Sequence, residues 1–338
     1  MSTFKSGHND AQVSLIEGAR IIVNVCASVQ AGEDVLVVTD KATSLSIAQN
    51  LASAAEEKGA SAAIAVVQAQ RTGTEPVRPV AAAMQAANVV IAATSASLYH
   101  TDAARNAVAG GARLLSMTEI SEEVMTSGAI TADFEAQGPI IESVRALLTS
   151  ARAVRVTAPG GTSLDMSLEG REAMQITALA RTPGTRSATP DLEAFIAPVE
   201  GTAEGVLVVD GSASNLGLIR TPVMMEISGG RVTSISGGQE ADRISANLRE
   251  ANHEGAYVIA ELGIGLNPNG LVRGHIIEDE GAYGTAHVAL GNNTNFTGGK
   301  NWAPVHFDHV FHRPTITLDG VEVMVDGVLT EAARPGRG

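Results

Sequence analysis

The feature that most constrains the fold is an alternation of short apolar runs with longer Ala-rich segments over residues 1–150. Four of the runs are rich in Val, Ile, Leu and Ala without regular polar alternation, which predicts strands buried on both faces. These runs are residues 34–39, 61–67, 88–93 and 112–116. The segments between them, such as 42–58, have apolar residues at helical spacing. Strand–helix alternation of this kind predicts a doubly wound parallel sheet.

The second half of the chain lacks this alternation and contains more short strand-like runs. Gly229-Gly230 separates residues 222–228 from 231–236, which is a strong hairpin signal. Further strand-like runs are residues 153–157, 163–168, 206–209, 256–262, 284–290, 315–318 and 321–325. The best candidate helix is 239–251, and the polar segment 181–191, with two prolines and a glycine, is expected to be a loop.

These patterns predict an α/β protein with two domains. We expect an N-terminal doubly wound domain over residues 1–151 and a β-rich α+β domain over residues 152–332. The short polar tail 333–338 is expected to be disordered.

Composition excludes several classes of protein. The chain is 44% hydrophobic and 18% charged, which is ample material for a buried core. A net charge of −14 argues against nucleic acid and anionic lipid as partners. The single cysteine, Cys26, excludes an intrachain disulfide and a site of several thiolates. No apolar run approaches the ~18 residues of a membrane span, and the N-terminal residues lack a signal-peptide pattern, so we expect a cytoplasmic protein.

Candidate metal ligands concentrate in the C-terminal half, where six of the eight histidines fall within residues 253–312. In His306-Phe307-Asp308, an imidazole and a carboxylate at i and i+2 of a strand would face the same side and converge on a divalent ion. Such a pair is also common without a metal. His309 and His312 are expected to lie at the surface or behind the ligands.

Three further residues are candidate ligands, each with an ordinary structural alternative. Glu261 lies at the end of an apolar run, where it is either a surface charge or a buried carboxylate that must be paired or bound to metal. His287 opens a strand after a Gly-rich turn and is either a ligand or a buried core histidine. Glu193 enters an apolar segment after a polar loop, although most glutamates in such places are solvated.

A small substrate would need polar anchors outside the metal ligands. Lys300 follows Gly298-Gly299 and could supply a cation and backbone donors for an anionic group, although an ordinary turn has the same pattern. Together with His100 and Tyr99 it could bind a small polar or carboxylated molecule.

Taken together, these residues resemble two related families that share a fold. One comprises the aminopeptidase T-like metallopeptidases of the thermophilic leucyl aminopeptidase type, and the other the 2,5-dihydroxypyridine 5,6-dioxygenases. The resemblance covers the whole chain as architecture, and its specific motifs fall within about 189–320.

The peptidase family holds two divalent ions with two Glu, two His and one Asp. The matching residues here are Glu193, Glu261, His287, His306 and Asp308. Thr294 stands where that family has a tyrosine. The dioxygenase family is similar in length, and the run GNNT, GGK and His306-x-Asp308 resembles its C-terminal signature. A histidine near His100 helps to hold the substrate in that family. Its single iron uses two His and one Asp, whereas Glu261 stands at the place of the first His.

The resemblance leaves three hypotheses. The first is a hydrolase of an amide or peptide C–N bond, in which one or two Zn, Mn or Co ions activate a water; His287 and Glu280 then have catalytic roles, Glu280 as general base or as orienter of His287. The second is an Fe(II)-dependent ring-cleaving dioxygenase with Glu261, His306 and Asp308 as ligands. The third is an inactive relative that binds or has a structural role. Because both families are homo-oligomers, we expect this chain to form one.

Overall fold

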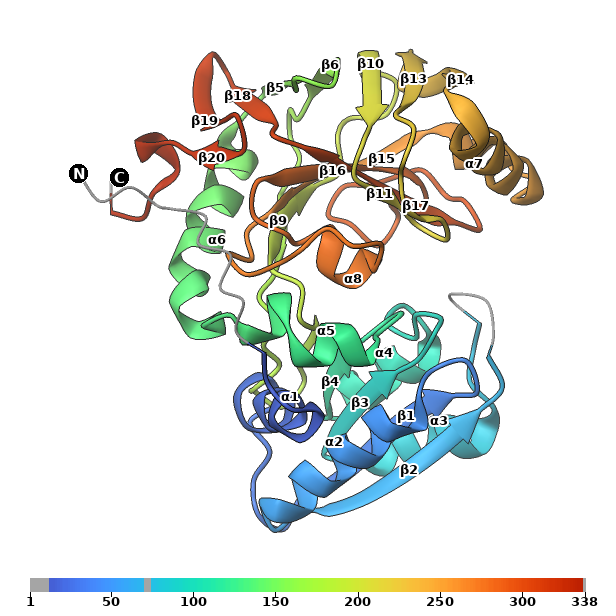
Figure 1. The fold of residues 1–338 in the computed structure, drawn as a ribbon, viewed down its shortest axis with the longest axis vertical. Coiled ribbons are helices and arrows are strands. Elements are labelled where there is room, and N and C mark those ends of the chain that lie inside the picture. Colours follow the sequence, from blue (N-terminus) through green and yellow to red (C-terminus); the bar gives the residue numbers. More distant parts are fainter. Residues whose placement is uncertain (1–11, 70–73, 337–338) are drawn as a thin grey trace. The chain divides into compact units, whose positions relative to one another are not determined.

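The computed structural model describes residues 12–69 and 74–336, which belong to two compact units (Figure 1). The first unit extends to Glu135 and also takes Ile176–Leu192 and Pro268–Gly270. The second unit takes Ala136–Gln175, Glu193–Asn267 and the chain from Leu271 onward. The two units therefore do not divide the chain at one position. Residues 136–150 precede the expected boundary near 151 but belong to the second unit, whereas Ile176–Leu192 follow it and belong to the first.

The first unit is a parallel sheet flanked by helices, as its sequence predicts. Its strands are β1 (Asp34–Asp40), β2 (Ser61–Val67), β3 (Val89–Ala93), β4 (Arg113–Ser116) and β8 (Arg186–Ala188), in the order β2-β1-β3-β4-β8 with every pairing parallel. Its helices are α1 (Leu15–Ile21), a π-helical turn (Ile22–Cys26), α2 (Leu45–Glu57), α3 (Arg78–Ala86), α4 (Asp102–Ala109), α5 (Glu122–Thr126) and a 3₁₀ turn (Gly128–Thr131).

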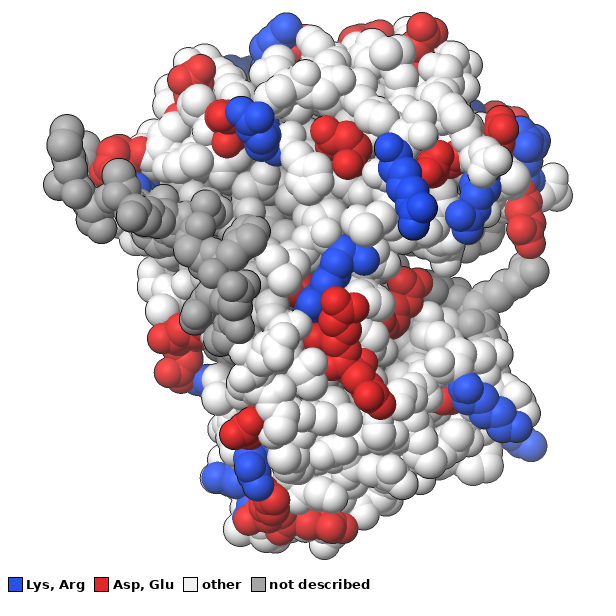
Figure 2. Space-filling view, in the orientation of Figure 1, with Lys and Arg blue, Asp and Glu red and all other residues white. Residues whose placement is uncertain are grey.

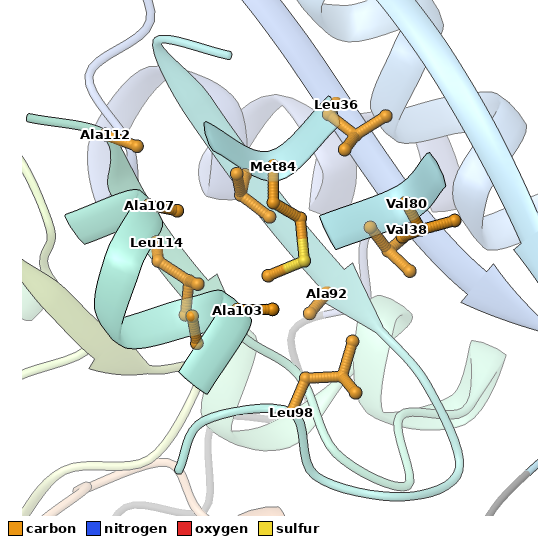
Figure 3. Close-up of a cluster of buried hydrophobic side chains, with 12 residues drawn as sticks. Leu36, Val38, Val80, Met84, Ala92, Leu98, Ala103, Ala107, Ala112 and Leu114 are labelled. Atoms are coloured by element: carbon orange, nitrogen blue, oxygen red, sulfur yellow. The ribbon is translucent and has the colours of Figure 1, made fainter. Parts of the chain in front are cut away.

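The core of this unit lies where α3 and α4 cover one face of the sheet. Leu36 and Val38 of β1 and Leu114 of β4 meet Val80 and Met84 of α3 (Figure 3). The buried residues that α4 contributes to this cluster are alanines, and its partly buried Val108 packs against them. Small side chains thus form much of the packing between this helix and the sheet.

Two expectations for the first unit are wrong. The run 61–67 was expected to be buried on both faces, but β2 is an edge strand in which Ile64 is 37% and Val66 52% exposed. Segment 181–191, expected to be a loop, contains β8, which pairs with β4 as the fifth strand. The apolar run 61–67 does not indicate that its strand lies at the edge of the sheet. The polar segment 181–191 does not indicate that it contains a strand.

The second unit is built from two antiparallel sheets. The eight-stranded sheet has the order β14-β13-β10-β6-β5-β18-β19-β20. Its strands are β5 (Ala153–Thr157), β6 (Ser163–Ser167), β10 (Glu204–Val209), β13 (Val223–Ser228), β14 (Arg231–Ser236), β18 (Thr315–Leu318), β19 (Val321–Val325) and β20 (Val328–Leu329). The hairpin between β13 and β14 turns at Gly229-Gly230, both at positive φ, as predicted.

The seven-stranded sheet has the order β12-β11-β17-β16-β15-β9-β7. Its strands are β7 (Met174–Ile176), β9 (Glu193–Ile196), β11 (Ser212–Ala213), β12 (Gly217–Leu218), β15 (Ile259–Gly265), β16 (Thr285–Gly291) and β17 (His306–His312). Every residue of β15 and β16 is buried, because these strands lie at the centre of the sheet.

The helices of this unit are few, as the sequence predicts. They are α6 (Phe134–Ser150, whose first two residues are counted with the first unit), α7 (Gly238–Glu250), α8 (Ile276–Asp279) and 3₁₀ turns at Glu254–Tyr257 and Glu331–Ala333. The expected tail starts inside the last of these turns, where Ala333 is fully buried, so order extends beyond residue 333. Residues 337–338 of the expected tail lie outside the described residues. An α/β domain followed by a β-rich α+β domain is therefore confirmed as the fold class.

Candidate metal centre

Four neighbouring strands of the seven-stranded sheet carry all five of the metal ligands that the sequence suggests. Glu193 begins β9, Glu261 lies within β15, His287 within β16, and His306 and Asp308 on β17. In the register of the sheet, Gly265 pairs with Glu193, Gly263 with His287, and Ala289 with both Glu261 and Asp308. Since alternate residues of a strand share a face, the register places the five side chains on one face of the sheet.

The five side chains converge into two groups of three that share Glu261. We call Glu193, Glu261 and His287 the inner triad, and Glu261, His306 and Asp308 the outer triad. In the inner triad, His287 Nε2 lies 3.3 Å from Glu193 Oε2 and 3.5 Å from Glu261 Oε1. In the outer triad, His306 Nε2 lies 3.0 Å from Glu261 Oε2 and 3.3 Å from Asp308 Oδ1. Each carboxylate oxygen of Glu261 therefore faces a different triad.

Gly263 makes the inner triad possible. A Cβ at position 263 would lie 2.1 Å from Cε1 and from Nε2 of His287. The imidazole of His287 thus lies across the bare backbone of β15 toward Glu193. This contact gives a physical reason for the Gly in the run AELGIG, which the sequence alone marks only as small and flexible.

The electrostatics of the cluster fit a site for divalent cations. The cluster contains three carboxylates and two imidazoles. Buried carboxylates need a compensating positive charge nearby. Burial opposes charge on His287, but its hydrogen bond with Glu261 and the charge of Glu193 raise its pKa to about 9. The pKa of Asp308 is lowered, because the charge of His306 outweighs the effect of burial. In the metal-free protein, protons on the histidines supply the charge that a bound cation would supply.

Two polar contacts hold the outer triad in place. Asn292 offers its main-chain carbonyl oxygen 2.8 Å from His306 Nδ1, so the Nδ1 proton can be donated there and Nε2 can face the carboxylates. Ser214 Oγ lies 3.3 Å from Asp308 Oδ2 and accepts the main-chain N–H of Asp308 at 2.9 Å. These contacts fix the two ligands that are nearest to solvent.

Glu280 directly follows α8 and interacts electrostatically with the cluster. Burial and the charges of Asp308, Glu193 and Glu261 raise the pKa of Glu280 well above its ordinary range. Loss of a proton from this carboxyl group is therefore harder than from a solvated glutamate. Among the described residues His287 Nδ1 has no hydrogen-bond partner, so orientation of His287 through a hydrogen bond to Glu280 has no geometric support.

The residues expected to anchor a substrate occupy two different environments. Lys300 lines a cavity of about 550 Å³ in the second unit together with Arg171, Glu200 and Arg231, and none of the five ligands lines it. His100 belongs to the first unit, where its ring makes an edge-to-face contact with Tyr99 at 4.9 Å between centroids. A role in substrate binding stays a prediction for both residues.

The sequence-based reasoning missed the aromatic neighbours of the metal centre and Ser214. Phe296 contacts His306 edge to face, with ring centroids 5.5 Å apart, and contacts Phe195 at 5.1 Å. Phe195 follows the candidate ligand Glu193 by two residues on β9, so its position in the sequence could have indicated this neighbour. His309 was expected at the surface or behind the ligands; it is buried, with Nδ1 3.2 Å from the Val288 carbonyl, and burial lowers its pKa to about 4.

Comparison with known proteins assigns the class that this fold and site define. The family described as NicX, 2,5-dihydroxypyridine 5,6-dioxygenase, matches residues 19–331. The chain therefore belongs to this family, which is one of the two that its motifs resemble. A relative from Pseudomonas putida KT2440 named 2,5-dihydroxypyridine 5,6-dioxygenase is 28% identical over 257 residues, which are 72% of this chain and 71% of the relative.

Two solved structures share the fold. The 2,5-dihydroxypyridine dioxygenase of Pseudomonas putida KT2440 superposes with a TM-score of 0.78 at 22% identity, covering 95% of this chain and 98% of its own. AmpT from Thermus thermophilus superposes with a TM-score of 0.66 at 18% identity, covering 94% of this chain and 98% of its own. An enzyme of a metal-binding family is thereby supported, while the hydrolase expected first from the sequence has no such support.

Surface charge and hydropathy add little to this assignment. On the face drawn in Figure 2, Lys and Arg side chains are spread singly and several lie beside acidic ones. The structure contains exposed ion pairs such as Arg155 with Asp165, 2.6 Å apart. Among the described residues, no helix has the length and apolar character needed to cross a membrane.

Proposed function

We propose that this protein is a metal-dependent ring-cleaving dioxygenase that acts on a small hydroxylated nitrogen heterocycle. The observation that carries the proposal is the family match over residues 19–331, together with a partly open triad of ligands within that range. Fe(II) with open coordination positions supplies the O₂ chemistry that ring cleavage needs.

In this proposal, different residues bind the metal, transfer a proton and bind the substrate. Glu261, His306 and Asp308 would hold the ion, and the Asn292 carbonyl would keep the Nδ1 proton of His306 turned away from it. Glu280, whose pKa is raised by burial and by the charges of Asp308, Glu193 and Glu261, would be the group that donates or accepts a proton beside the reacting ring. His100 and Lys300 are proposed to bind the polar groups of the substrate.

A second candidate function is supported by one specific observation. The inner triad adds Glu193 and His287 to the shared Glu261, which is the donor set for a second ion. Two ions held by these residues would activate a water and polarise a carbonyl, as amide hydrolysis requires. The second candidate is therefore a two-metal hydrolase of an amide or peptide bond.

Metal content and oxygen consumption distinguish the two candidates. Protein purified without oxygen or chelator is analysed for its elements, then assayed with 2,5-dihydroxypyridine at an oxygen electrode and with dipeptides and simple amides. The dioxygenase predicts activity with one Fe(II) per chain and oxygen uptake matched to ring loss. The hydrolase predicts two Zn, Mn or Co ions per chain and amide cleavage without oxygen.

A matched pair of variants makes the test sharper. His306→Ala removes an outer ligand and His287→Ala an inner one. For the dioxygenase, His306→Ala abolishes activity, while His287→Ala keeps one iron and most of the activity. Equal loss in both variants, with a second ion lost in His287→Ala, would favour the hydrolase and contradict the first proposal.

A further inference from the structure

The metal centre is closed on one side and open on the other. Side chains of the inner ligands are almost fully buried, with exposed fractions of 1% for His287, 5% for Glu193 and 4% for Glu261. The outer ligands are more accessible, at 28% for His306 and 12% for Asp308. A substrate must therefore reach the ion from the side of His306.

Phe296 is the aromatic residue that lies at this open side. Its half-buried ring meets the His306 imidazole at 79°, in an edge-to-face contact. It also meets Phe195, 5% exposed, at an interplanar angle of 61°. One part of the Phe296 ring is thus held by two neighbouring rings, and the rest remains exposed beside the most accessible ligand.

The loop that carries Phe296 is fixed by hydrogen bonds. Asn293 and Asn301 bond to each other twice, through Asn293 N–H to Asn301 O at 2.9 Å and Asn301 N–H to Asn293 Oδ1 at 2.8 Å. The Phe296 N–H donates to Asn293 O, and Gly299 N–H donates to Phe296 O. Asn293 Nδ2 donates to Glu200 at 2.9 Å. The position of the ring is therefore set before any substrate arrives.

We propose that Phe296 is a specificity-determining residue that binds the planar ring of the substrate at the entrance to the outer triad. An aromatic face held beside the ion favours a flat ring over a flexible aliphatic chain, because aromatic pairs gain from offset or edge-to-face packing beyond simple burial. This inference rests on the proposed function, since it assumes a ring as substrate. It adds the element that selects that ring.

The test uses the iron-loaded protein and three substitutions. Phe296→Leu keeps an apolar side chain but removes the aromatic face, Phe296→Ala removes both, and Phe296→Tyr keeps the ring. Phe307→Leu is the matched control, because Phe307 is also half-buried but points to the opposite face of β17 from His306. Iron content, anaerobic binding of 2,5-dihydroxypyridine, and anaerobic binding of azide are measured for each.

We expect affinity for dihydroxypyridine to fall in the variants that lack an aromatic ring at position 296. Phe296→Leu keeps the iron and the azide affinity of the original protein but binds dihydroxypyridine about three- to tenfold more weakly. Its KM rises by the same factor while kcat changes less than about twofold. Phe296→Tyr and Phe307→Leu stay within about twofold of the original protein. Phe296→Ala weakens ring binding at least as much as Phe296→Leu.

Three results would overturn the inference, and they can be told apart. Unchanged ring binding in Phe296→Leu, with a normal enzyme otherwise, removes the role of Phe296 and leaves the proposed function standing. Equal loss of azide and ring affinity means that Phe296 only supports His306. If the original protein neither binds nor cleaves a dihydroxypyridine, the proposed function itself fails and the inference fails with it.

Discussion

The inner and outer triads share one carboxylate and one face of one sheet, yet they differ in their access to solvent. The inner triad lies among buried residues of β9, β15 and β16. The outer triad includes β17, whose first residues are only partly buried. The inner triad therefore holds its side chains among fully buried residues and away from water, whereas the partly buried start of β17 leaves coordination positions that a substrate can reach.

Because the two triads differ in solvent access, we expect an ion in each to have a different role. An ion in the inner triad would be enclosed and would tune the charge around Glu261. An ion in the outer triad would have open positions, which is the property that separates catalytic from structural metal sites. The following predictions alter one triad at a time, or the residue that they share.

The largest effect is expected at the shared residue. Glu261→Gln keeps the shape of the side chain but removes the charge that faces both triads. Activity should fall by about a thousandfold or more, because a correctly held ion supplies several kcal/mol of stabilisation. Metal content and activity are measured together, with the exposed Glu226→Gln on β13 as control. Full activity in Glu261→Gln would show that the two triads do not act through a common ligand.

Metal affinity should rise steeply with pH. In the metal-free protein, burial lowers the pKa of His287, but Glu261 and Glu193 outweigh it and hold the pKa at about 9; that of His306 is also raised. A cation must displace these protons, so affinity increases about tenfold per pH unit for each proton released, up to about pH 9. Calorimetry in buffers of different ionisation enthalpy measures the released protons. Binding without proton release would contradict the charge balance described for the cluster.

The same protonation makes the stability of the metal-free protein depend on pH in the opposite direction. A folded-state pKa above the unfolded value of about 6.5 stabilises the fold fully below that value. This contribution is lost as pH rises through about 9. The urea midpoint of chelator-treated protein should therefore fall between pH 6.5 and 9, while that of metal-loaded protein does not.

Gly263→Ala should break the inner triad and spare the outer one. The added Cβ would lie 2.1 Å from His287 Nε2, so the imidazole must leave its place across β15. Affinity for an inner ion should fall by about a hundredfold, with the outer ion retained. Gly138→Ala, where a Cβ meets nothing within 4 Å, is the control. Metal titration followed by activity measurement then tells whether the enzyme needs the inner ion.

Much of the fold and the ligands could be predicted because their signals are local. The buried strands β1 and β3 are continuous apolar runs, and His306 and Asp308 are two residues apart on one strand. Ser214 and Phe296 could not be predicted in this way. Ser214 reaches Asp308 from 94 positions earlier in the chain, because β11 pairs with β17. Phe296 reaches His306 through a loop whose path depends on Asn293 and Asn301.

The smallest predicted effect concerns that missed serine and the outer triad alone. Ser214→Ala removes the hydroxyl that bonds the Asp308 carboxylate and accepts its N–H. Groups that orient a metal ligand typically contribute about tenfold to metal affinity, so an ion held by the outer triad should bind about tenfold more weakly. Activity should return when iron is supplied in excess, because no ligand has been removed. If excess iron fails to restore activity, Ser214 acts on the substrate as well, and the outer triad includes more of the catalytic machinery than its three ligands.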